Sequence, residues 1–130
     1  MSDQQVTSEA KQVAAVRELL NEEKWTRAAL NNYTVNNFKE LDEALQGIFD
    51  EDLEDEVAEI CEEHLLHTKN SIIALYLSGI LRLSRQAVDD GNLVNLINIF
   101  SDNHKWGIVE YLAKRILEFG ENKYALRTLA

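Results

Sequence analysis

Apolar side chains along this 130-residue chain recur at steps of three and four residues, the spacing that places them on one face of an α-helix. Eight segments follow this spacing, and short polar breaks separate them. In chain order they are Val13–Leu20, Trp25–Tyr33, Phe38–Phe49, Leu53–Thr68, Ile72–Val88, Asn92–Phe100, Lys105–Phe119 and the residues from Asn122 onward. Short connections join antiparallel helices. The pattern predicts an all-α domain of about seven helices and a C-terminal stub, built from antiparallel hairpins.

Residues that favour helix ends stand at several of the predicted boundaries. The N-cap candidates are Ser8, Asn36 or Asn37, Asp52, and Asn70 or Ser71. Gly91 is predicted to end the fifth helix in the left-handed conformation, and Gly120 to stop the seventh. Because the segment Ile72–Val88 is apolar around most of its circumference, we expect it to be the central helix.

Composition supports the all-α class and narrows the setting. The chain has no proline and only five glycines, so it lacks the turn residues of a β-sandwich or barrel. Its single cysteine, Cys61, cannot form an internal disulfide and fits a reducing compartment. No signal-peptide core is found near the N-terminus, and the longest apolar run, Ile72–Leu83, is too short and too interrupted to cross a membrane. We expect a cytoplasmic protein that does not bind membranes.

The charge is negative overall and unevenly distributed. Thirteen Lys and Arg against 23 Asp and Glu give a net charge of −10, which disfavours direct binding to nucleic acid. Residues 1–63 hold 17 acidic and 5 basic side chains, whereas residues 64–130 hold 6 and 8. The excess of acids within residues 1–63 indicates either a solvated helix face or a docking patch for a basic partner. The candidate partner-binding residues are Asp50, Glu51, Asp52, Glu54, Asp55 and Glu56.

Motifs for metal binding or catalysis are weak. A calcium-binding EF-hand loop starting at Asp50 would need glycine at its sixth position and glutamate at its twelfth, where Asp55 and Cys61 stand. Cys61, His64 and His67 follow one another at three-residue steps, but no second cluster completes a metal shell. The chain lacks a nucleophile elbow and a phosphate-binding glycine loop. We therefore expect a non-enzymatic chain without a cofactor or a metal.

Two similar pentapeptides point to an internal repeat. N-E-E-K-W at 21–25 and D-N-H-K-W at 102–106 each follow an amphipathic segment and open the next one. We expect Trp25 and Trp106 to wedge between the helices of a hairpin, with the neighbouring lysine in water. Residues 90–130 also resemble a tetratricopeptide repeat, through Leu93, Leu96 and Phe100 and through the Lys-Trp pair. This resemblance implies hairpins stacked as an α–α superhelix, although Glu121 stands where that family usually has proline.

A second resemblance covers residues 19–43, L-L-N-E-E-K-W-T-R-A-A-L-N-N-Y-T-V-N-N-F-K-E-L-D-E. This run resembles the opening of the long Gre-type transcription elongation factors of spirochaetes, in which a helical-repeat extension precedes the Gre domain. The resemblance implies a role near RNA polymerase. An apolar helix pattern also begins at Asn122 and stops at Ala130. We therefore expect residues 1–130 to form a single helical-repeat domain from the N-terminal part of a longer protein.

Two classes of function remain open from the sequence. The first is a scaffold that binds a protein or peptide, with RNA polymerase or the chain's own downstream domain as partner. The second is a structural or oligomerisation module that packs against the rest of its own chain or against a second copy. A concave groove lined by polar side chains favours the first class, and an apolar patch of more than about a few hundred Å² at the Ala130 end favours the second.

Far-UV circular dichroism tests the predicted fold class. The helical spacing and the missing proline predict a spectrum dominated by α-helix. A β-type spectrum would contradict the prediction.

Overall fold

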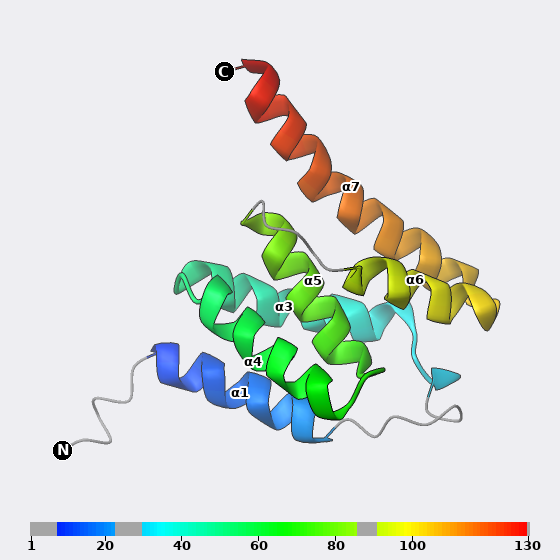
Figure 1. Cartoon of the computed structure of the whole chain (residues 1–130), viewed down its shortest axis with the longest axis horizontal. Helices are drawn as coiled ribbons and strands as arrows, with labels where there is room; N and C mark the ends of the chain where they lie inside the picture. Colours follow the sequence, from blue (N-terminus) through cyan, green and yellow to red (C-terminus); the bar gives the residue numbers. More distant parts are fainter. Residues whose placement is uncertain (1–7, 23–29, 86–90, 130) are drawn as a thin grey trace.

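The computed structural model describes residues 8–22, 30–85 and 91–129, with side chains over 11–22, 30–85 and 91–118. These ranges contain six α-helices and no strand, which confirms the all-α prediction for them. The helices are α1 (Ser8–Glu22), α3 (Val35–Asp50), α4 (Glu54–His67), α5 (Ile72–Ser84), α6 (Asn92–Asp102) and α7 (Trp106–Leu129) (Figure 1). The predicted helix Trp25–Tyr33 falls mostly outside the described residues, and the predicted count of seven helices and a stub is wrong for the described ranges.

Helix α5 is the centre of the fold, as its all-round apolar sequence predicts. It contacts α1, α3, α4, α6 and α7, that is, every other described helix. Its buried residues are Ile72, Ala74, Leu75, Tyr76, Leu77, Ser78, Gly79, Ile80 and Leu81. Of the two predicted caps, Asn70 and Ser71, the cap is Ser71, whose side chain accepts a hydrogen bond from the Ala74 N–H at 3.2 Å. The helix ends at Ser84, short of the predicted Val88.

An aromatic cluster packs α3 and α6 against α5. The ring of Phe38 lies 5.1 Å from Tyr76 and 5.6 Å from Phe100, both in edge-to-face geometry. Tyr33 and Tyr111 flank the same ring at 6.1 and 6.4 Å. Phe38, Tyr76 and Phe100 are fully buried. Residues far apart in sequence are therefore held around one phenylalanine.

Two predicted N-caps are displaced by local hydrogen bonds. Helix α3 is capped by Thr34, whose N–H donates to the Asn37 side chain at 2.8 Å, so Asn37 lies inside the helix. Helix α4 begins after Leu53, and the predicted cap Asp52 has a left-handed φ of 56°. This turn lets the Leu53 N–H donate to the Ile48 carbonyl at 3.0 Å and buries the Leu53 side chain. Burial of the Leu53 side chain thus favours the turn that places the start of α4 at Glu54.

Both glycines expected to end helices have other roles. Gly91 is left-handed as predicted, with φ 82°, but it caps the start of α6. Gly120 does not stop a helix, because α7 continues through it to Leu129. A glycine inside a helix costs only about 1 kcal/mol relative to alanine, and helix-forming residues on both sides outweigh that cost. The predicted seventh helix and the stub are therefore one helix.

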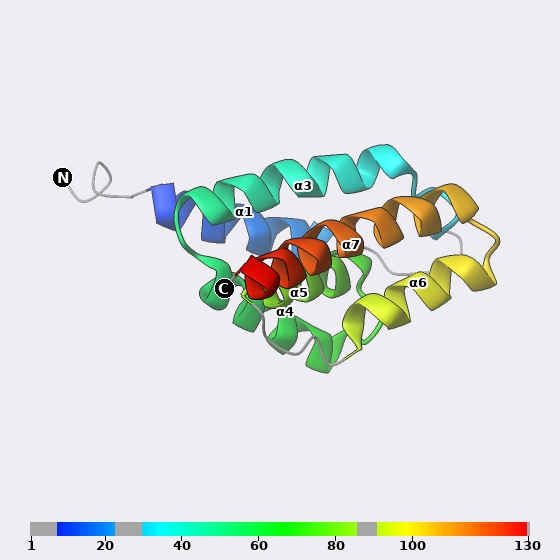
Figure 2. The ribbon, with the colours of Figure 1, turned by 90° about the horizontal axis from the view of Figure 1, so that it is seen from above.

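The tetratricopeptide-like superhelix is not confirmed by the described helices. In a stack of repeats each hairpin contacts only its neighbours in sequence. Here α3 contacts α7 and α1 contacts α5, so distant segments close around the central helix. Figure 2 shows α3, α7 and α6 running side by side, with α5 among them. The arrangement is that of a closed bundle whose last helix projects beyond the other helices (Figure 1).

The predicted roles of lysine and tryptophan at the α6–α7 turn are reversed. The Trp106 side chain is 58% exposed, so its role as a buried wedge is wrong, while Trp25 lies outside the described residues. Lys105 is half-buried, and its Nζ donates to the Asn31 carbonyl at 2.6 Å. The indole instead lies 5.9 Å from the His104 ring, in edge-to-face geometry at the turn. Tyr33, predicted to be helical, lies in the turn before α3.

Two alanine substitutions test this reversal. Phe100→Ala should lower the free energy of unfolding by about 3–5 kcal/mol, because it empties a fully buried site. Trp106→Ala should change it by no more than about 0.5 kcal/mol at low protein concentration, because the indole is mostly in water. Urea denaturation measures both, and equal losses would show that Trp106 is a wedge after all.

Candidate functional site

The six predicted partner-binding acids gather around the turn between α3 and α4. Asp50 ends α3, Glu51 and Asp52 form the turn, and Glu54, Asp55 and Glu56 make the first turn of α4. Asp50, Asp52, Asp55 and Glu56 are exposed, whereas Glu51 and Glu54 are half-buried. Carboxylates in the first turn of α4 are stabilised by the positive end of the helix dipole.

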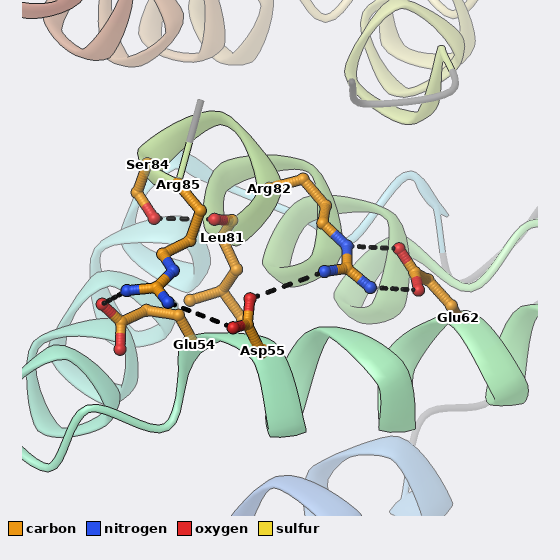
Figure 3. Close-up of polar contacts among 7 residues, drawn as sticks. All are labelled: Glu54, Asp55, Glu62, Leu81, Arg82, Ser84 and Arg85. Carbon is orange, nitrogen blue, oxygen red and sulfur yellow. Dashed lines mark hydrogen bonds and ion pairs between the residues drawn. The ribbon is translucent and has the colours of Figure 1, made fainter. Parts of the chain in front are cut away.

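Two arginines from the end of α5 bind part of this acidic segment (Figure 3). Arg82 makes a two-pronged contact with Glu62, with Nε and one terminal nitrogen at 2.8 and 2.7 Å from the carboxylate. Its other terminal nitrogen lies 3.6 Å from Asp55. Arg85 lies 3.1 Å from Asp55 and 3.9 Å from Glu54. The hydrogen bond to Glu62 raises the pKa of Arg82, so this guanidinium stays charged.

These contacts divide the acidic segment into two sets with different roles. Glu54, Asp55 and Glu62 fasten α4 to α5 and are partly neutralised. Asp50 accepts a hydrogen bond from Gln46 at 2.9 Å, and Glu51, Asp52 and Glu56 form no ion pair with any described residue. We call Asp50, Glu51, Asp52 and Glu56 the open acidic edge. This edge is the part of the predicted patch that retains uncompensated charge.

The Cys61, His64 and His67 series does not form a common site. Cys61 is fully buried, and burial, followed by the charge of Glu62, raises the pKa of its thiol to about 12. Such a thiol is a poor nucleophile and a poor metal ligand. His64 and His67 instead line a cleft of about 200 Å³ between α1 and α4, together with Arg17 and Glu63. Among the described residues, no group of three metal-binding side chains is found.

A second, larger cleft of about 320 Å³ lies where α1, α3 and α5 meet. Its lining contains both apolar and polar side chains. The lining residues are Leu19, Asn32, Tyr33, Asn37, Glu40, Leu41 and Ile73. Of these, Asn32 and Glu40 are exposed. The cleft has the polar groups that the sequence analysis associates with a binding groove, but it is formed by three helices rather than by a superhelix.

A polar cluster that the sequence analysis missed joins α3, α5 and α7. The carboxylate of Asp42 accepts hydrogen bonds from the hydroxyls of Tyr76 and Tyr111. Arg115 lies 3.3 Å from Asp42 and also donates to the Tyr76 hydroxyl at 3.4 Å. The side chains of Asp42 and Arg115 are only 19% and 23% exposed. No periodic pattern relates these four positions, so only the packing of three helices brings them together.

The Asp42 cluster holds its tyrosines in the neutral form. Burial, and then the hydrogen bond to Asp42, raises the pKa of Tyr111 to about 12. The same causes, in the same order, raise the pKa of Tyr76 further. Deprotonation of either hydroxyl would remove a donor and place two negative charges side by side. The cluster therefore fastens α7 to the rest of the bundle.

Alkaline titration tests the Asp42 cluster. Because these tyrosine pKa values are raised on folding, their contribution to stability is complete below the unfolded value of about 10 and is lost as the pH rises toward about 12 and beyond. Tyrosinate absorbance should show two of the four tyrosines ionising late in the folded chain. Asp42→Asn should bring both toward the ordinary value, and Tyr111→Phe should remove one late step. Ordinary titration of all four tyrosines in the folded parent chain would contradict the cluster.

Within the described residues, no helix is both long enough and apolar enough to span a membrane.

Comparisons with known proteins place this chain beside Gre-named proteins of spirochaetes. Over 112 residues, 86% of the chain, it is 46% identical to a protein of Borreliella burgdorferi named transcription elongation factor GreA. Over 100 residues, 77% of the chain, it is 53% identical to a protein of Treponema pallidum named putative GreA-associated domains protein. No family model matches the chain, and no solved structure matches it.

The relatives are much longer than this chain. The matched regions cover 12% of the Borreliella burgdorferi protein and 15% of the Treponema pallidum protein. The resemblance found at residues 19–43 is confirmed and extends over most of the chain. The chain is thus related to a segment of Gre-named proteins.

Proposed function

We propose that this chain is a non-catalytic protein-interaction segment of a Gre-like transcription elongation factor, and that it acts near RNA polymerase in the cytoplasm. The proposal is carried by the 46% identity to a protein named transcription elongation factor GreA over 86% of the chain. The match is to a segment covering 12% of that protein, so the proposed role is that of one segment within a larger factor.

The described surface supports interaction rather than chemistry. The one thiol is buried and protonated, and the arginines Arg82 and Arg115 are bound to carboxylates of the same chain. The polar groups available to a partner include the open acidic edge and the cleft of α1, α3 and α5. These are surfaces that bind a protein or a peptide.

We assign the first contact with a basic partner to the open acidic edge. Its four carboxylates span the end of α3, the connecting turn and the start of α4, and the adjoining acids are held in place by Arg82 and Arg85. The edge is therefore presented by a rigid support, and it carries charge that no described residue neutralises. A basic partner would be steered to it over distances that shrink from ~10 Å at 0.1 M salt to ~3 Å at 1 M.

Binding kinetics with RNA polymerase from the source organism test this proposal. The edge variant carries Asp50→Asn, Glu51→Gln, Asp52→Asn and Glu56→Gln. The control variant removes the same charge from exposed acids elsewhere, through Glu18→Gln, Glu22→Gln, Glu43→Gln and Asp102→Asn. At low salt the edge variant should associate about tenfold more slowly than the parent chain, with dissociation changed less than about twofold.

The control variant separates a local patch from the effect of total charge. Because both variants change the net charge equally, the control should associate nearly as fast as the parent chain if the edge is the docking site. Equal slowing of both variants would reject the edge as a specific site while leaving polymerase binding in place. The absence of any binding by the parent chain would overturn the proposed role at RNA polymerase.

A further inference from the structure

The outward face of α7 carries large apolar side chains that contact no described core. Trp106 and Leu117 are each 58% exposed, although the opposite face of the same helix buries Ile108 and Leu112. The two exposed residues are eleven positions apart, which is three turns of helix, so they lie on one side of α7. Tryptophan is enriched among the residues that supply the binding energy of protein interfaces.

Between Trp106 and Leu117 this face carries Ala113, which is half-exposed, and the charged residues Glu110 and Lys114. In Figure 1, α7 lies at the edge of the fold, and its C-terminal half extends past the other helices. No described helix covers this face.

The charges on this face are arranged symmetrically between the two apolar residues. Glu110 and Lys114 form an ion pair of 3.0 Å, and their side chains are 67% and 72% exposed. Glu110 is four residues after Trp106, and Lys114 is three residues before Leu117. If two such helices met antiparallel about a two-fold axis, Trp106 of each would face Leu117 of the other. Glu110 of each would then lie within one residue of the position opposite Lys114 of the other, about 1.5 Å along the helix and within reach of the two long side chains.

We propose that this chain forms a symmetric homodimer through antiparallel pairing of the α7 faces that carry Trp106, Glu110, Lys114 and Leu117. The occupant is a second copy because every feature of the face has its complement on the same face in reversed order, as an isologous interface requires. The net charge of −10 on each chain makes two copies repel each other over most of their surface. This face carries one acid and one base, so its own charges cancel. The dimer is independent of the proposed role at RNA polymerase.

The size of the interface sets the strength of the dimer. Two helices paired over only three turns bury less surface than a standard protein interface, which buries ~1,200–2,000 Å². In this pairing one Trp106 lies at each end of the contact, and tryptophan is the side-chain type that contributes most often to the energy of an interface. The dimer is therefore reversible, and its population rises with protein concentration.

Sedimentation and light scattering over a concentration series measure this dimer directly. The parent chain should approach twice its 14.9 kDa mass as concentration rises. The variant Trp106→Ala with Leu117→Ala should raise the dissociation constant by roughly 30-fold or more. Because both side chains are mostly exposed, circular dichroism and thermal melting should show an unchanged fold.

Charge reversal identifies the face and the antiparallel register. Glu110→Lys alone and Lys114→Glu alone should each weaken self-association, because like charges then meet across the two-fold axis. The double reversal should restore the dimer, and mixing the two single variants should give a heterodimer. Glu43→Lys, on the exposed side of α3, is the control and should still dimerise.

Three results would overturn the proposal. The parent chain could stay at 14.9 kDa up to the highest soluble concentration. The tryptophan–leucine variant could dimerise as strongly as the parent chain, which would place the interface elsewhere. The single charge reversals could behave like Glu43→Lys, which would exclude the antiparallel pairing of Glu110 with Lys114.

Discussion

Helix α5 is apolar on nearly all sides, so its side chains must be shielded from water by other helices. The other described helices pack around it and provide that shielding. Nine of its thirteen residues are buried, and they include the polar Ser78 and the large Tyr76. Burial of a polar group without a partner is costly, so each of these groups has one. Ser78 donates to the Ala74 carbonyl at 2.7 Å and accepts from the Asn92 side chain at 3.0 Å, while the Tyr76 hydroxyl donates to Asp42. Burial of the apolar surface of α5 favours packing of the other helices against it. The few polar contacts then specify the position of α3 and α6 relative to α5.

The basic end of α5 links this core to the acidic surface. Arg82 and Arg85 follow directly after the buried part of the helix, and they reach Glu62, Asp55 and Glu54 on α4. These ion pairs are partly exposed, so their contribution to stability is modest, but a network in fixed geometry orients side chains. The network separates the acids that bind arginine from the open acidic edge. Of the six predicted partner-binding acids, four remain for the proposed docking surface.

Helix α7 has two faces with opposite roles. Its inner face carries Tyr111 and Arg115, which join Asp42 in a half-buried polar cluster, and Leu112, which enters the core. Its outer face carries Trp106 and Leu117 in water. Because the inner contacts hold the helix firmly, the outer residues are presented without the entropy cost of ordering a loop on binding. The proposed polymerase surface and the proposed dimer face lie on different elements, so both can be occupied in one assembly.

Local patterns in the sequence were enough to predict the helical class from apolar spacing, the central place of α5 from its all-round apolar sequence, and a cap at Asn70 or Ser71. Other features depend on how the helices pack. Gly120 is an ordinary residue of α7 because its neighbours sustain the helix, Trp106 is exposed although its pattern suggested a buried wedge, and Asp42 meets Tyr111 across 69 positions. The open edge also emerged from the arginines of α5, which neutralise only part of the acidic run. The two groups of features differ in the sequence separation of the residues involved. Helix caps and apolar helix faces depend on residues a few positions apart, whereas burial and charge pairing depend on which distant segments the core brings into contact.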